Sequence, residues 1–278
     1  MASRLGVDPG AKLDPRLVRR VQPAMGTVVS IHAAPCGLSD QRVREAIDAA
    51  MATIDDLEAR FSPWRPESEV SRLASGALVE ADASADLRWV LGVCDYLAVI
   101  TEGRFDARRH RADGRFDPSA LVKGWIVDEA ARHLDDAGIR SYAINAGGDV
   151  LARGEPATGR GWRIGIRHPD GVDRVAAVLE VRDLAVATSG LYERGGHIRD
   201  PRRGDVPVGL RSLTVTGPSL AFADAYATAG FVMGRDGVAW VAGRPGHEAL
   251  GITIDDRVLS TAGMATLLSR SSHGAAVS

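Results

Sequence analysis

The hydrophobic pattern of this chain changes near residue 140, and that change constrains the fold more than any other feature. Before residue 138, apolar side chains recur at the three-four spacing typical of amphipathic helices. From residue 141 onward, short β-like runs follow one another, separated by Gly, Pro and Asp turns. Because the two patterns are grouped rather than alternating, the sequence predicts an α+β fold and not a regular βαβ repeat.

The predicted elements follow from these patterns. Helices are expected from Ser39 through Leu57, from about 84 to 100 with Gly103 as a cap, from about 121 to just before 138, over 219–230 and over 237–243. A short helical piece is expected within the loop 61–76. Extended segments are expected over 21–34, 141–152, 162–169, 176–183, 184–190, 210–217, 248–254 and 257–260.

The length of 278 residues allows one large domain or two small ones. We expect a single domain over 16–267, with mobile tails at 1–15 and 268–278. The net charge of −2 gives no general reason to expect nucleic-acid or membrane binding. The two cysteines lack CxxC spacing, which argues against a zinc site or a disulfide framework. The N-terminal segment has no apolar core resembling a secretory signal, so we expect a cytoplasmic location.

The segment SLAFADAYATAG (219–230) reads as a helix of small residues that carries one acid and one hydroxyl. Asp224 and Thr228 are one turn apart and therefore share a face, with Ala221 one turn earlier. Carboxylate and hydroxyl oxygens are hard ligands of the kind that Mg²⁺ prefers. Taken alone, the helix favours a structural interpretation, in which the acid stabilises the helix start and the hydroxyl bonds back to a carbonyl.

The segment FDPSALVKGWIVDEA (116–130) places polar residues before an apolar helix. Asp117 and Ser119 suit helix capping, and capping is the favoured interpretation for Ser119. Lys123 falls in the first turn, where a cation is mildly unfavourable unless a phosphate or carboxylate lies close by. A solvated surface lysine is an equally good interpretation of that residue from this segment alone.

Two later segments combine glycine with polar groups. NAGGDV (145–150) contains Gly147 and Gly148, which suit a plain turn or the close approach of a ligand to the backbone. ATSGLYERGGHIRDPRRG (187–204) contains Thr188, Ser189 and His197. The two hydroxyl residues suit a turn, and the histidine is either structural or a general base.

Together, these segments resemble the ApbE family of FAD:protein FMN transferases. The matching blocks extend from about residue 22 to residue 264, and it is their order that makes the resemblance strong: AMGTVVSI, FSPWRPESEVSRL, DPSALVKGWIVD, YAINAGGDV, WRIGIRHPDG, VATSGLYER, GHIRDPRRG and SLTVTGPSLAFADAYATAGFVMG. The resemblance implies a T-fold-like α+β protein, with mixed or antiparallel sheets flanked by helices and an FAD cleft between two lobes. It also implies Mg²⁺-dependent transfer of FMN from FAD to a Thr or Ser hydroxyl of an acceptor flavoprotein, with release of AMP.

The resemblance also implies roles for individual residues. The metal ligands would be Asp224, Thr228 and a backbone oxygen at Ala120, with the small Ala221 beside them; His197, Asp224 and Lys123 are the catalytic candidates. The candidate flavin contacts are Met25, Trp64 in place of the usual Tyr, Asp117, Lys123, Gly147, Gly148, Thr188, Ser189, His197 and Ile198.

This chain departs from the family pattern in two shortened stretches, at 106–114 and 190–197. Three functions from different classes are therefore compatible with the sequence. The first is a flavin transferase, the second is an FAD pyrophosphatase that uses water as the acceptor, and the third is a non-catalytic FAD-binding protein.

Overall fold

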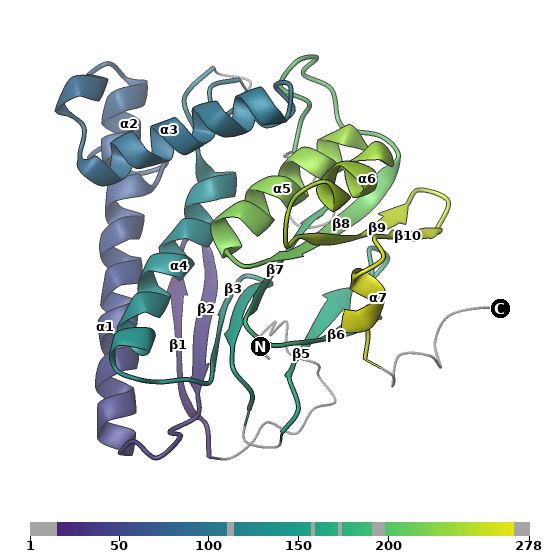
Figure 1. Ribbon diagram of the computed structural model, residues 1–278. Coiled ribbons are helices and arrows are strands. Elements are labelled where there is room, and N and C mark those ends of the chain that lie inside the picture. Colours follow the sequence, from purple (N-terminus) through teal and green to yellow (C-terminus); the bar gives the residue numbers. More distant parts are fainter. Residues whose placement is uncertain (1–15, 110–113, 157–158, 172–173, 191–197, 270–278) are drawn as a thin grey trace.

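One large antiparallel sheet organises the protein in the computed structural model, which describes residues 16–109, 114–156, 159–171, 174–190 and 198–269. The sheet has eight strands in the order β1-β2-β3-β4-β7-β8-β9-β10 (Figure 1). Every neighbouring pair is antiparallel. The strands are β1 (Val18–Ala24), β2 (Thr27–Ala33), β3 (Tyr142–Ala146), β4 (Asp149–Arg153), β7 (Leu184–Gly190), β8 (Leu210–Gly217), β9 (Glu248–Thr253) and β10 (Val258–Ser260).

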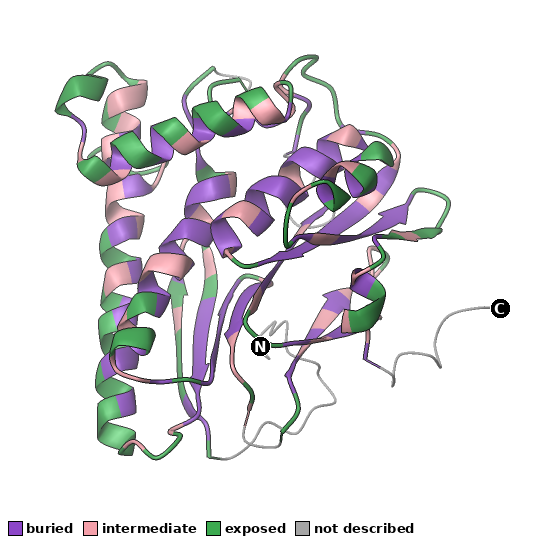
Figure 2. Ribbon diagram, in the orientation of Figure 1, coloured by how far each residue is buried: buried purple, intermediate pink, exposed green. Residues whose placement is uncertain are grey.

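Helices pack against one face of this sheet. The buried sides of α1 (Asp40–Phe61), α4 (Ser119–Asp136) and α5 (Leu220–Met233) form one apolar core with alternate residues of the strands, among them Ile31, Ile144 and Val215. Figure 2 shows the burial along α5, which is almost wholly enclosed. The smaller helices on this side are α2 (Glu69–Ala74), α3 (Ala85–Ile100) and α6 (Asp236–Ala242).

A second apolar core covers the opposite face. It is built from the two-stranded sheet of β5 (Trp162–Arg167) and β6 (Val175–Val181), together with α7 (Met264–Leu267). Leu268 and Ser269, which the sequence places in a mobile tail, pair with β6: Leu268 bridges Leu179, and the Ser269 N–H donates to the Val178 carbonyl at 2.8 Å. The segments 1–15 and 270–278 of the two expected tails lie outside the described residues.

The grouped pattern predicts the α+β class correctly, with local differences in the elements. The segment 21–34 is a hairpin rather than one extended piece, because Met25 and Gly26 form a turn with φ of 53° and 67°. At the end of α3, Thr101 is the C-cap residue, and Glu102 and Gly103 both take the left-handed conformation. Gly103 acts in capping as predicted, because its N–H donates to the Ala98 carbonyl at 2.8 Å. The 3₁₀ turn Glu80–Asp82 and α7 are not predicted by the pattern.

Ser39 begins α1 as predicted: its hydroxyl accepts the Arg42 N–H, and the apolar stripe behind it is buried. Helix α5 continues to Met233, three residues beyond the predicted end. Within the described ranges, none of the helices combines the length and the apolar character that a membrane span requires.

Candidate active site

Asp224 and Thr228 share a face of α5, as their spacing predicts, and the structure shows that this face points toward α4 and the sheet. Asp224 is buried, with 4% of its surface exposed, whereas Thr228 is half-buried. The Thr228 hydroxyl lies 3.1 Å from the hydroxyl of Ser189 on β7. Helix α5 therefore carries a carboxylate and a hydroxyl on its inner face, one turn apart, beside a second hydroxyl from the sheet.

Lys123 joins three elements at this position. From α4, its ammonium forms an ion pair with Asp149 on β4 and lies 3.3 Å from Asp224 Oδ2 on α5. The side chains of Asp149 and Asp224 are each only 5% exposed, and that of Lys123 is 26% exposed. We call Lys123, Asp149 and Asp224 the inner cluster. The interpretation of Lys123 as a solvated surface residue is wrong, because its ammonium is held between two buried carboxylates.

Asp149 is a member of this cluster that the sequence interpretation missed. Its Oδ1 accepts the Thr188 N–H at 2.9 Å, while its Oδ2 contacts Lys123. Asp149 is the first residue of β4, next to the apolar run Val150–Leu151, where a solvent-facing acid is unexpected. An acid directly before an apolar run after a glycine turn is the sequence signal that could have found it.

Gly147 and Gly148 place Asp149 through a tight hairpin turn between β3 and β4. Their φ angles are 68° and 114°, and Ala146 pairs directly with Asp149 across the turn. The Gly148 N–H donates to Asn145 Oδ1 at 2.9 Å. The glycine pair therefore forms the predicted turn, and the turn fixes the start of β4.

The residues before α4 divide the capping role differently from the prediction. Ser119 is the first residue of the helix rather than its cap, and Pro118 is the N-cap residue. The Asp117 carboxylate accepts both the backbone N–H of Ser119 (3.0 Å) and its hydroxyl. Asp117 thus supplies the acceptor for the first turn, which holds Ala120 and Lys123.

The remaining predicted residues lie at several positions around the fold. The Thr188 hydroxyl bonds to Thr214 on the next strand (2.9 Å), so of this residue only the N–H meets the inner cluster. Met25 lies in the β1–β2 turn, Trp64 is 73% exposed between α1 and α2, and Ile198 is buried in the main core. His197 lies outside the described residues.

The donors on α5 fit a hard divalent cation. A buried carboxylate and a half-buried hydroxyl face the same side, and both are oxygen ligands of the kind that Mg²⁺ takes. Ala221 is buried one turn earlier and adds no bulk on that face. Ala120 lies in the first turn of α4, the helix that brings Lys123 to Asp224.

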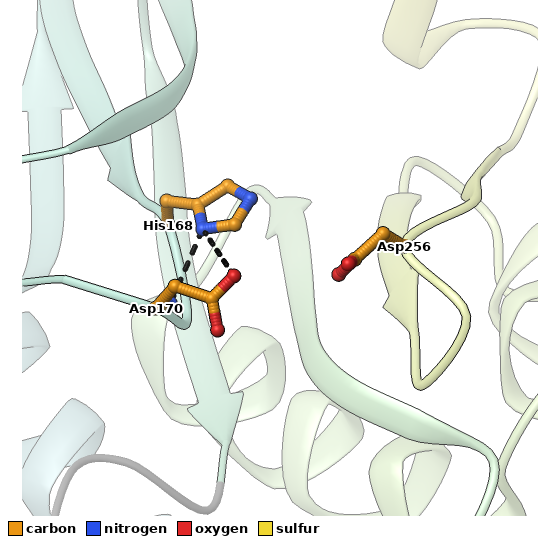
Figure 3. Close-up of side chains that lie close together, drawn as sticks. All are labelled: His168, Asp170 and Asp256. Atoms are coloured by element: carbon orange, nitrogen blue, oxygen red, sulfur yellow. Dashed lines mark hydrogen bonds and ion pairs between the residues drawn. The ribbon is translucent and has the colours of Figure 1, made fainter.

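A second group of potential metal ligands lies at the surface (Figure 3). His168 and Asp170 follow β5, and Asp256 lies in the β9–β10 turn; one ligand atom from each falls within 4.8 Å of the others. Arg211 on β8 already pairs with both carboxylates, and its guanidinium lies 2.6 Å from Asp256 Oδ1. His168 Nδ1 accepts the Asp170 N–H at 3.2 Å. We call these four residues the outer cluster, and a metal there would have to displace the guanidinium.

Comparison with known proteins places this arrangement in a family. The family model described as "ApbE family" matches residues 25–111 and 107–251. The FAD:protein FMN transferase of Haemophilus influenzae is 26% identical over 260 residues, which cover 71% of this chain and 74% of that protein. The FAD:protein FMN transferase of Treponema pallidum is 34% identical over 173 residues, covering 55% of this chain and 48% of that protein.

Solved structures agree on the fold. An ApbE protein from Thermotoga maritima superposes with a TM-score of 0.79 at 22% identity, covering 91% of this chain and 99% of the other. Flavin transferase ApbE from Vibrio cholerae superposes with a TM-score of 0.77 at 24% identity and the same coverage. Because the family model spans most of the described residues, the chain belongs to the ApbE family.

Proposed function

We propose that this protein is an FAD:protein FMN transferase. It transfers the FMN part of FAD to a Thr or Ser hydroxyl of an acceptor flavoprotein and releases AMP, with Mg²⁺ as its metal. Membership of the ApbE family supports this function, and so do the names of the curated relatives. The observation that carries it is the inner cluster, where an ammonium held by buried carboxylates lies beside hard oxygen donors.

Asp224 and Thr228 would hold the metal, together with the backbone oxygen of Ala120. When bound, Mg²⁺ supplies positive charge that neutralises the phosphate oxygens of FAD. Lys123 supplies a second positive charge at the same position, and a quarter of its side chain remains accessible. Asp149 orients that ammonium, because its other oxygen is held by the Thr188 N–H at 2.9 Å.

The transfer replaces a phosphoanhydride bond of FAD by a phosphoester bond at the same phosphorus. The acceptor hydroxyl oxygen forms a bond to the phosphorus on the riboflavin side, and the bond from that phosphorus to the AMP oxygen breaks. His197 is the first choice as the base that takes the hydroxyl proton, and Asp224 is the second. Met25, Trp64, Asp117, Gly147, Gly148, Ser189 and Ile198 remain the proposed flavin contacts, with the Thr188 backbone beside them.

The decisive experiment supplies the purified protein with FAD, Mg²⁺ and an acceptor that carries a D-x-x-[ST]-[GA]-A-[ST]-like segment. We expect a flavin-fluorescent acceptor band on a denaturing gel and one AMP released for each flavin attached. An acceptor whose target hydroxyl residue is changed to Val or Ala is the control, and it should remain dark.

The other outcomes separate the competing functions. Release of free FMN and AMP without labelling of the acceptor would show that the protein is an FAD pyrophosphatase, in which water is the acceptor, and not a transferase. Intact FAD bound to the protein would show that it is a non-catalytic FAD-binding protein. A cytoplasmic location of the reaction stays a prediction.

A further inference from the structure

Three residues of α4 lie in one line toward the start of α5. Ala120, Gly124 and Asp128 follow one another at intervals of four residues, and therefore share one face of the helix. Ala120 belongs to the proposed metal site, whereas the other two have no role in the function described so far. The contacts of Gly124 and Asp128 show how this face of α4 positions α5.

The Asp128 carboxylate accepts hydrogen bonds from the N-terminal turn of α5. Its Oδ1 accepts the Leu220 N–H at 3.0 Å, and its Oδ2 accepts both the Ala221 N–H at 3.0 Å and the Ser219 hydroxyl at 2.7 Å. The first N–H groups of a helix have no partner within it, and a carboxylate is favoured at this positive end. Asp128 therefore ties the first turn of α5 to the middle of α4.

Gly124 allows the backbones of the two helices to touch. A Cβ atom at this position would overlap the carbonyl group of Leu220 and approach the Ala221 nitrogen to 2.6 Å. Gly124 thus sets how closely the helices approach, and Asp128 sets where along α4 the first turn of α5 sits. Only one turn further along α5, Asp224 meets Lys123 at 3.3 Å.

We infer that Asp128 is a positioning residue for the metal site: it fixes the register of α5 against α4, and so the placement of Asp224 and Thr228 relative to Ala120 and Lys123. This inference rests on the proposed function. The two oxygens of Asp128 are both needed, because each accepts a different backbone N–H. An Asn in its place keeps only one acceptor oxygen.

The test measures metal affinity separately from activity. Asp128→Asn and Asp128→Ala are compared with the wild type in the full-length protein, using Mn²⁺ as a paramagnetic probe and Mg²⁺ titrations of AMP release. We expect Mn²⁺ affinity to fall about tenfold in Asp128→Ala, the range typical when a group that orients metal ligands is removed. The loss should be smaller in Asp128→Asn, and saturating Mg²⁺ should restore most of kcat in both.

Glu69→Gln is the matched control. Glu69 also receives a backbone N–H from the start of a neighbouring helix, that of Ser84 before α3, at 3.0 Å. Its loss should lower stability without changing the affinity for Mn²⁺. Equal Mn²⁺ affinity in the wild type and both Asp128 variants would overturn this inference and leave the proposed function intact. Absence of Mn²⁺ binding by the wild type would overturn the metal-dependent function, and the inference with it.

Discussion

The inner and outer clusters contain the same kinds of charge in two different surroundings. Each places two carboxylates around one cationic side chain. In the inner cluster both carboxylate side chains are 5% exposed. In the outer cluster they are 42% and 61% exposed. Water can solvate the outer carboxylates whether or not they are paired, but it has almost no access to the inner carboxylates. Burial, rather than the number of possible ligands, therefore distinguishes a candidate active site from a surface ion-pair group.

The largest difference between the clusters should appear in catalysis. We expect Asp224→Ala to lower AMP release from FAD by about a thousandfold, because phosphoryl transfer depends mainly on positioning and charge stabilisation. Asp256→Ala in the outer cluster should leave the rate near that of the wild type. Product chromatography measures both rates, and circular dichroism checks that both variants are folded. Wild-type rates in Asp224→Ala would refute the inner cluster as the active site.

The cations of the two clusters should differ in their effect on stability. Lys123→Met leaves two buried carboxylates facing one another, and we expect the free energy of unfolding to fall by about 3 kcal/mol. Arg211→Met leaves two carboxylates that water can solvate, because they are 42% and 61% exposed, and it should cost at most about 1 kcal/mol. Urea unfolding at neutral pH measures both values. Equal losses would mean that the buried carboxylates have found other partners or protons.

The individual helices and strands could be predicted from the sequence, because the spacing of apolar residues within one segment determines which face it buries. The apolar spacing behind Ser39 and the alternation in β5 each report a buried face directly. By contrast, the joining of the N-terminal hairpin to β3 in one large sheet depends on pairing between residues more than 100 positions apart, such as Ile31 with Ile144. No spacing within either segment contains that information.

The inner cluster shows the same limit for the site. The spacing of Asp224 and Thr228 correctly predicts their common face, because one helix determines it. Asp149 and Asp128 were missed because their partners come from other elements: Lys123 is 26 residues before Asp149, and Leu220 is 92 residues after Asp128. Tertiary packing gives these two acids their partners, and the spacing within one segment does not contain that information.

The Thr228 hydroxyl, which lies on the same face of α5 as Asp224, can be tested separately from the inner cluster. We expect Thr228→Val to raise the Mg²⁺ concentration for half-maximal activity by about tenfold, since it removes one oxygen donor while preserving shape. Thr228→Ser keeps the hydroxyl and should stay close to the wild type. Thr216→Val, at a buried position of β8, is the control for loss of a hydroxyl elsewhere. Equal metal dependence in the Val and Ser variants at 228 would remove Thr228 from the ligand set.

The smallest effect is expected at His168 in the outer cluster. Its pKa lies below the ordinary value of 6.5 because of partial burial first, and then because of the positive charges of Arg174 and Arg211; Asp256 opposes the shift. The fold thus favours the neutral imidazole, so this contribution to stability is present above pH 6.5 and is lost as the pH falls through the folded-state pKa. Arg211→Ala should raise the His168 pKa by less than about one unit, because exposed charges are screened. NMR titration of the imidazole at low and high salt measures the shift. A rise of several pKa units that did not depend on salt concentration would mean that the outer cluster behaves as a buried site. The contrast between the two clusters would then be refuted.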